Sequence, residues 1–131
     1  MDAEGTSMGK FIIKGTKNGG FKFDLVAGNG EVIANSQVYK SLRTLKSGMA
    51  SVIRNCKSPV EDQTVEPFEA IKCPKFEVYK DKAGEFRFRL RASNGQNIVH
   101  GEGYSSKSSC LNGIDSIGRN ATEDAKVVRE E

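Results

Sequence analysis

The sequence has little of the chemistry that metal sites, disulfide frameworks and imidazole catalysis require. It contains a single histidine, His100, and three cysteines, Cys56, Cys73 and Cys110. An odd number of cysteines with no Cys-x-x-Cys pair fits neither a disulfide framework nor a zinc site. We therefore expect free thiols, no bound metal and no cofactor.

An excess of one charge and a long apolar run are also missing. Lys and Arg number 20 against 17 Asp and Glu, for a net charge of +3, whereas dedicated nucleic-acid-binding proteins usually have a clear basic excess. No stretch approaches the roughly 20 apolar residues that cross a bilayer. Residues 1–8 are acidic and lack the apolar core of a secretion signal. We expect a soluble, cytoplasmic protein without a membrane partner, whose residues 1–8 form a tail.

The chain consists of one motif written twice. Residues 9–56 match residues 74–121 at a constant offset of 65 with no gap, which indicates the duplication of a folding unit. We divide the chain into repeat unit 1 (9–66), a linker (67–73) and repeat unit 2 (74–131). The identities fall at aromatic, turn and cap positions and include Phe11/Phe76, Phe21/Phe86, Phe23/Phe88, Leu25/Leu90, Asn29/Asn94, Gly30/Gly95, Tyr39/Tyr104, Ser41/Ser106 and Gly48/Gly113.

Each unit begins with the pattern of three strands. Residues 21–27 and 86–92 alternate apolar and polar side chains, which predicts strands with one buried and one exposed face. An Asn-Gly pair follows each, and it predicts a type I′ turn into the next apolar run. A shorter apolar run upstream, at 11–13 or 76–78, predicts the remaining strand.

The second part of each unit has a helical period. Ser41 and Ser106 are expected N-caps, and the apolar positions that follow them form one stripe. Gly48 and Gly113 lie within these helices, and we expect them to allow close approach to the sheet. Short β-branched segments at 63–65 and 126–128 then predict a last strand. Each unit therefore has the order β-β-β-α-β.

Several of these segments resemble the YegP-like family of small bacterial tandem-repeat proteins. The resemblance rests on Gly28–Ile33, Gly101–Lys107, Asn112–Ile114, the pair Arg54-Asn55, and Arg119–Ala121. It implies an α+β fold in which two β(3)-α-β repeats form one antiparallel sheet, exchange their C-terminal strands across a pseudo-twofold axis and pack their helices on one face. We also expect a monomer with internal pseudo-twofold symmetry. The resemblance implies no function. A unit of about 60 residues buries little surface alone, which favours such an exchange.

The strongest functional signal is a row of three arginines in repeat unit 2. Alternation places Arg87, Arg89 and Arg91 on the face opposite the apolar residues, with Tyr79 expected beside them and Lys22 at the matching place in unit 1. The alternative is a solvated face on which neighbouring carboxylates, such as Glu77, pair with the arginines. We favour a non-enzymatic binding or interaction module whose open basic sheet face takes an anionic partner, either nucleic acid or an acidic protein segment.

Two further sites are weaker hypotheses. Ser106 and Lys107, at the start of the second helix, are placed to hold an anion, although capping alone accounts for the serine. The alternative function is an enzyme with an unusual site near His100, Cys110 and the Tyr104 loop, in which the imidazole would activate the thiol. Cys110 also fits the apolar stripe of its helix as a small hydrophobic residue, so we expect no catalytic residues.

Overall fold

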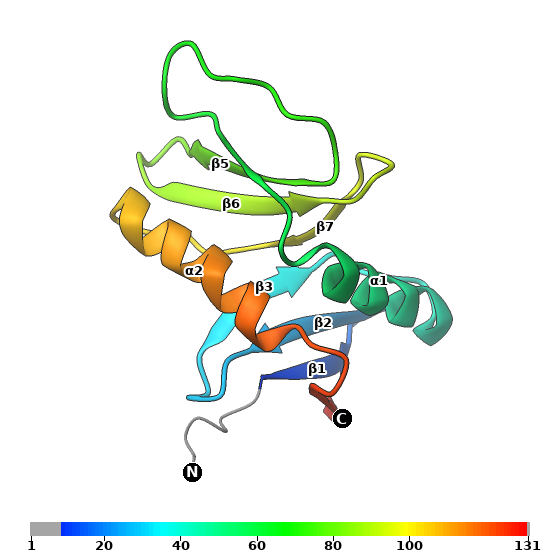
Figure 1. Ribbon diagram of the computed structural model, residues 1–131. Coiled ribbons are helices and arrows are strands. Elements are labelled where there is room, and N and C mark those ends of the chain that lie inside the picture. Colours follow the sequence, from blue (N-terminus) through cyan, green and yellow to red (C-terminus); the bar gives the residue numbers. More distant parts are fainter. Residues whose placement is uncertain (1–8, 131) are drawn as a thin grey trace.

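The computed structural model describes residues 9–130, and the tail expected at residues 1–8 lies outside this range. The described chain alternates hairpins and helices in the same order twice (Figure 1). The elements are β1 (Lys10–Gly15), β2 (Phe21–Val26), β3 (Val32–Ser36), α1 (Leu42–Asn55), β4 (Val60–Asp62), β5 (Lys75–Lys80), β6 (Phe86–Arg91), β7 (Asn97–His100), α2 (Lys107–Asn120) and β8 (Lys126–Glu130).

All of these strands belong to one sheet with the order β4-β5-β6-β7-β3-β2-β1-β8. The strands from β5 to β1 are antiparallel to their neighbours, and the two repeats meet where β7 pairs with β3. The outermost strands pair in parallel, β4 with β5 and β8 with β1. The last strand of each repeat therefore lies beside the first strand of the other. The sheet is therefore mixed, and the expectation of a wholly antiparallel sheet was wrong at its two outermost strands. Tight hairpins join only antiparallel neighbours, whereas the parallel pair β4 and β5 is joined by the long loop 63–74.

The last strand of the first repeat lies earlier than the sequence pattern predicted. We expected it at 63–65, but β4 covers Val60–Asp62. The Asp62 carboxylate accepts hydrogen bonds from the Thr64 backbone N–H at 2.9 Å and from the Thr64 hydroxyl at 2.5 Å. This local turn ends the strand, because an Asp side chain that binds the backbone two residues later competes with strand pairing.

The hairpins connect at the predicted Asn-Gly pairs, but the turns are not type I′. A type I′ turn needs a positive φ at both central residues. Gly30 and Gly95 have φ of 92° and 85°, and no described residue other than glycine has a positive φ. Hydrogen bonds from Gly30 N to Ala27 O and from Ala27 N to Glu31 O close a three-residue loop that ends on the glycine. In this turn the Asn29 side chain accepts the Glu31 N–H at 3.0 Å instead of taking a left-handed backbone.

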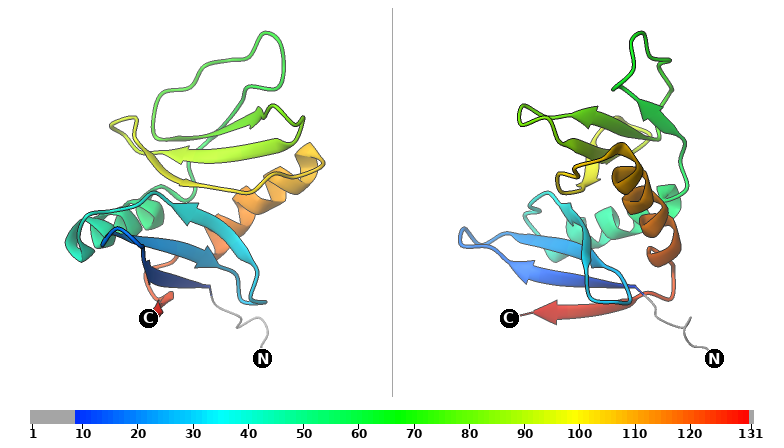
Figure 2. Two further views of the ribbon diagram at one scale, coloured as in Figure 1. Left: turned by 180° about the vertical axis from the view of Figure 1, so that it is seen from behind. Right: turned by 90° about the vertical axis from the view of Figure 1, so that its left-hand side faces the viewer.

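Both helices cover the same face of the sheet (Figure 2). The predicted caps are present: the Ser41 hydroxyl accepts the Thr44 N–H and the Ser106 hydroxyl accepts the Ser109 N–H, each at 3.1 Å. Neither helix is long and apolar enough to cross a membrane, in the part of the chain described.

The glycines within the helices make room for tyrosine side chains. A Cβ atom built on Gly48 would lie 2.1 Å from the Tyr39 Oη, and one on Gly113 would lie 2.4 Å from the Tyr104 Oη. We had expected these glycines to let the helix backbone approach the sheet itself. The approach is instead to an aromatic ring, which stacks in turn on a buried phenylalanine of the sheet, Phe88 in the second repeat.

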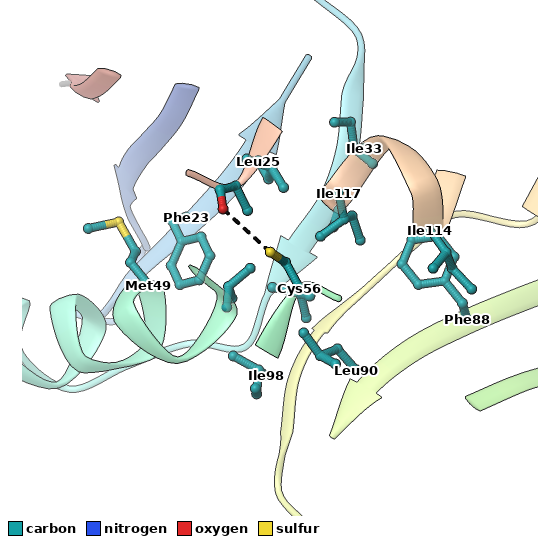
Figure 3. Close-up of a cluster of buried hydrophobic side chains, with 14 of the residues drawn as sticks. Phe23, Leu25, Ile33, Met49, Cys56, Phe88, Leu90, Ile98, Ile114 and Ile117 are labelled. Atoms are coloured by element: carbon teal, nitrogen blue, oxygen red, sulfur yellow. Dashed lines mark hydrogen bonds between the residues drawn. The ribbon is translucent and has the colours of Figure 1, made fainter. Parts of the chain in front are cut away.

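Apolar side chains from both repeats form a single core between the helices and the sheet (Figure 3). Phe23 and Leu25 from β2 face the helices together with their counterparts Phe88 and Leu90 from β6, and all four are fully buried. The Cys56 thiol lies among them and donates to the Ala121 carbonyl at 3.6 Å. The two repeats therefore share one hydrophobic core.

Candidate functional site

The sheet face that the helices leave uncovered carries the basic residues singled out from the sequence. In the strand register Arg87 lies opposite Tyr79, Arg89 opposite Glu77, and Arg91 opposite Lys75. Residues paired in this way point to the same side of a sheet, whereas Phe88 and Leu90 between them point into the core. The three arginines and Tyr79 therefore share the uncovered face, which we call the open face.

The arginines are held by carboxylates, as the alternative interpretation expected. Arg89 and Arg91 each donate from Nε to the same Glu77 oxygen, at 2.5 and 2.7 Å. Arg87 donates from Nε to Asp81 at 2.6 Å. Glu77 is 5% exposed, so it is a buried anion that requires these partners. The pairs fix the arginine side chains in place and neutralise part of their charge.

The pKa values of these carboxyl groups reflect the pairing. Burial alone would raise the pKa of Glu77, but hydrogen bonds from Arg89 and Arg91 outweigh it and lower the pKa below its usual range. The hydrogen bond from Arg87 is the main cause that lowers the pKa of Asp81. Both carboxylates are thus ionised at neutral pH and bind their arginines as charged groups.

Tyr79 is beside the arginines but is already occupied. The Arg89 guanidinium carbon lies 4.3 Å from the centre of the Tyr79 ring. This cation–π contact orients Arg89 and covers one face of the ring. Tyr79 therefore serves as a support for Arg89 more readily than as a platform for a stacked base.

The first repeat adds lysines to the same face. Lys22 lies opposite Lys14, and Lys10 lies opposite Val26 and beside Lys126 of β8. Lys14 pairs with Asp24 at 2.9 Å, whereas Lys10, Lys22 and Lys126 form no ion pair with any residue from 9 to 130. Basic residues outnumber carboxylates on the open face: the register places Lys10, Lys14, Lys22, Lys75, Arg87, Arg89, Arg91 and Lys126 there against Asp24, Glu61, Glu77 and Glu130. Asp81, which pairs with Arg87, adds one more carboxylate beside them.

Glu61 is a buried carboxylate that the sequence pattern did not single out. It lies on β4 next to Glu77 and is 2% exposed. Lys75 donates to it at 2.6 Å, and the Ile71 N–H of the long loop donates at 2.7 Å. Burial alone would raise its pKa, but these bonds and one from Gln63 lower the pKa to about 2. Glu61 thus ties the loop to the sheet, a role visible only once β4 and β5 are paired.

The residues of the enzyme hypothesis are not brought together. His100 pairs with Arg89 and Asn35, so it lies exposed on the open face, whereas Cys110 belongs to α2 and is fully buried on the other side of the sheet. Burial is the main cause that raises the pKa of the Cys110 thiol to about 11, which makes it a poor nucleophile. The interpretation of Cys110 as a core residue fits this environment better.

The start of α2 is also occupied by its own contacts. The Ser106 hydroxyl caps the helix, and the Lys107 amine donates to Asp62 at 2.8 Å. Lys107 therefore joins the second repeat to the last strand of the first. Among residues 9–130 no three His, Cys, Asp or Glu side chains gather in a way that would hold a metal ion.

Two matched clefts lie on the helix side, and sequence reasoning missed them. One, which we call the α1 cleft, has a volume of about 300 Å³ and lies between α1 and the Asn94 turn of the second repeat. The other, which we call the α2 cleft, has a volume of about 360 Å³ and lies between α2 and the Asn29 turn of the first repeat. Each cleft is built from a helix of one repeat and a hairpin of the other. The sequence pattern within one repeat therefore could not predict it. His100 lines neither cleft.

The fold and the open face define the class of protein: two α+β repeats that share one sheet and one core. The model of the domain of unknown function DUF1508 matches residues 16–62 and again residues 81–127, at the offset of the internal repeat. The chain belongs to this family, which confirms the resemblance seen in the sequence.

Relatives of two sizes match this chain. The UPF0339 protein YegP of Yersinia pestis is 37% identical over 114 residues, which cover 87% of this chain and 89% of the relative. A UPF0339 protein of Treponema denticola is 57% identical over 53 residues, which cover 40% of this chain but 91% of that protein, so it holds about one repeat. A UPF0339 protein of Stutzerimonas stutzeri is 60% identical over 55 residues, and the match spans half of its length.

The solution structure of YegP from E. coli, a protein of unknown function, is similar over nearly the whole chain. The TM-score is 0.75 at 29% sequence identity, with 94% of this chain and 93% of that chain covered. The family thus establishes the fold and leaves the function open.

Proposed function

We propose that this protein is a non-enzymatic binding module whose open face takes an anionic chain, with a nucleic-acid backbone as the first candidate partner. The observation that carries the proposal is the excess of Lys and Arg over carboxylates on the one sheet face that no helix covers. Charged residues on an uncovered surface act through their summed field.

The arginines suit this role although carboxylates hold them. Glu77 and Asp81 bind Nε atoms, and the Nη groups of Arg87 and Arg89 make no hydrogen bond within residues 9–130. An arginine fixed through Nε still presents donors in a planar fork to phosphate or carboxylate oxygens. Pre-positioning also reduces the side-chain entropy that binding would otherwise cost.

The expected binding is weak and insensitive to sequence. Arginines at every second position of a strand meet phosphates more readily than base edges. With a net charge of only +3, we expect micromolar affinity at best at physiological salt. Affinity should fall steeply as salt rises, with roughly one counterion released for each phosphate that is neutralised.

The test is a titration of a labelled single-stranded oligonucleotide, followed by fluorescence anisotropy at low and at physiological salt. Replacing the three arginines would leave the buried Glu77 with Lys75 as its remaining ion-pair partner, at 3.4 Å. The first variant is therefore Lys10→Gln, Lys22→Gln, Lys126→Gln, whose side chains form no ion pair in the described chain. It should weaken binding and reduce its salt dependence.

The matched control removes the same charge from the helix side, by Arg43→Gln, Lys46→Gln and Lys57→Gln, which are all exposed. It should bind as the wild type does. Equal loss in both variants would mean that only net charge matters and would count against the open face. An absence of binding at low salt would exclude nucleic acid and make an acidic protein segment the next partner to test.

A further inference from the structure

The two clefts on the helix side are copies of one another. Every residue that lines the α1 cleft corresponds, at the offset of 65, to a residue that lines the α2 cleft. Tyr39 matches Tyr104, and Asn94 matches Asn29. Volumes of about 300 and 360 Å³ are at the lower end of the range of small-molecule sites.

The copies have diverged in charge at two positions. The α1 cleft has Gln37 and Gln96, and the α2 cleft has Glu102 and Glu31 at the same places. The side chains differ only in that an amide nitrogen replaces a carboxylate oxygen. The two clefts therefore have corresponding positions, but only the α2 cleft has carboxylates.

A positive charge completes the α2 cleft. Arg119 lines it together with Glu31 and Glu102, yet none of the three forms an ion pair within residues 9–130. The only hydrogen bond to these side chains in that range is from the Asn29 amide to Glu31, at 3.1 Å. Burial and then Cys110 are the main causes that raise the pKa of Tyr104, and Glu102 and Glu31 add to the effect.

Charges of both signs that share a cleft and do not pair with each other suit a ligand that carries both signs. We propose that the α2 cleft binds a small zwitterion, with its ammonium group toward Glu31 and Glu102 and its carboxylate toward Arg119. Arginine is well suited to hold a carboxylate, and charge-assisted hydrogen bonds are the stronger kind. This site is independent of the open face, which lies on the other side of the sheet.

The experiment uses a ladder of ω-amino acids from glycine to 6-aminohexanoate as probes, because chain length reports the separation of the charged groups. Hexanoate and hexylamine, which each carry one of the charges, are the controls. Binding to the full chain is followed by backbone amide shifts in NMR titrations up to about 10 mM, a concentration suited to weak ligands. We expect one length to shift Tyr104 and Gly113 and to leave Tyr39 and Gly48 unchanged.

Two variants use the repeat as its own control. Glu31→Gln with Glu102→Gln gives the α2 cleft the glutamines that the α1 cleft has at these two positions, and should reduce affinity at least about tenfold. Gln37→Glu with Gln96→Glu makes the reverse change and should create binding seen at Tyr39. Arg54, the counterpart of Arg119, lines the adjoining hollow, which shares Ser51, Ala92 and Asn94 with the α1 cleft. All four positions are exposed, so the fold should persist.

Several results would overturn the proposal. They are the absence of shifts with every member of the ladder, equal binding of hexylamine or hexanoate, and binding that survives the loss of both carboxylates. Loss of binding in the first variant together with a gain in the second would support it, because a general change in folding cannot produce both.

Discussion

Replacing Gly113 by alanine should destabilise the protein, although alanine is the better helix former. Helix propensity alone favours the alanine by up to about 1 kcal/mol. The added Cβ would lie 2.4 Å from the Tyr104 Oη, 3.0 Å from its Cζ and 3.2 Å from Cε2 of Phe88. Phe88 is fully buried and stacks on the tyrosine ring, with centroids 6.3 Å apart, so the ring cannot move inward.

The tyrosine must therefore rotate outward and give up part of this stacking. Overpacking of this kind costs roughly 1 to 3 kcal/mol, which exceeds the gain in propensity. We expect a net loss of about 1 kcal/mol in the free energy of unfolding, or roughly 3 to 5 °C in Tm for a chain of this size. Gly48→Ala should cost more, because its Cβ would lie 2.1 Å from the Tyr39 Oη and 2.6 Å from Cζ.

Gly118 provides a control in the same helix. The nearest atom to a Cβ placed there is the Cys56 carbonyl oxygen at 3.4 Å, which is an ordinary contact. Gly118→Ala should therefore stabilise the protein by up to about 1 kcal/mol, since only propensity changes.

The assay is urea denaturation of the wild type, Gly113→Ala, Tyr104→Phe and the double variant. Removing the hydroxyl leaves Cζ, at 3.0 Å, as the nearest tyrosine atom, so Gly113→Ala should cost less in the phenylalanine background. A raised stability of Gly113→Ala in the wild-type background, or the same cost in both backgrounds, would show that the contact with Tyr104 is not what retains the glycine.

Three further predictions concern the carboxylates, the repeats and the thiols. Folding lowers the pKa of Glu61 from 4.5 to about 2, so its contribution to stability is present above pH 4.5 and is lost as the pH falls toward 2. In Glu61→Gln the urea midpoint should therefore change less with pH between these values than it does in the wild type. The same pH dependence in both proteins would contradict this. The two halves of the chain, residues 9–73 and 74–131, should not fold as monomers when they are expressed separately, because each needs the last strand of the other. Sedimentation should detect unfolded chains or homodimers rather than cooperatively folded monomers. A thiol reagent at mildly alkaline pH should label the half-buried Cys73 quickly and the buried cysteines only after denaturation, and rapid native labelling of Cys110 would refute its buried environment.

The one-repeat relative bears on the second of these predictions. A chain of about one repeat has no partner repeat to lend it a last strand, yet the Treponema denticola protein matches at 57% identity. Pairing with its own copy would complete the sheet. We expect the separated halves of this chain to follow the same route if they fold.

Local features were readable from the sequence because they depend on neighbouring residues. The alternation through Phe86–Arg91 predicted which side chains of β6 face the core, and Ser106 predicted where α2 begins. Both follow from the strand period and from the hydrogen-bonding capacity of a serine at a helix start. The turn at Asn29 was placed correctly but its type was wrong, because the Asn side chain satisfied the backbone in a way that composition does not reveal.

What only the tertiary structure decided depends on residues far apart in the chain. The sequence could place Arg89 on one face, but the shared Glu77 oxygen that holds Arg89 and Arg91 required the register between β5 and β6. The end of β4 was decided by the turn at Asp62, and the burial of Glu61 by the loop that returns over it. The two clefts join a helix of one repeat to a hairpin of the other. Periodicity describes each element by itself, whereas register, burial and the joining of the two repeats are properties of the packed chain.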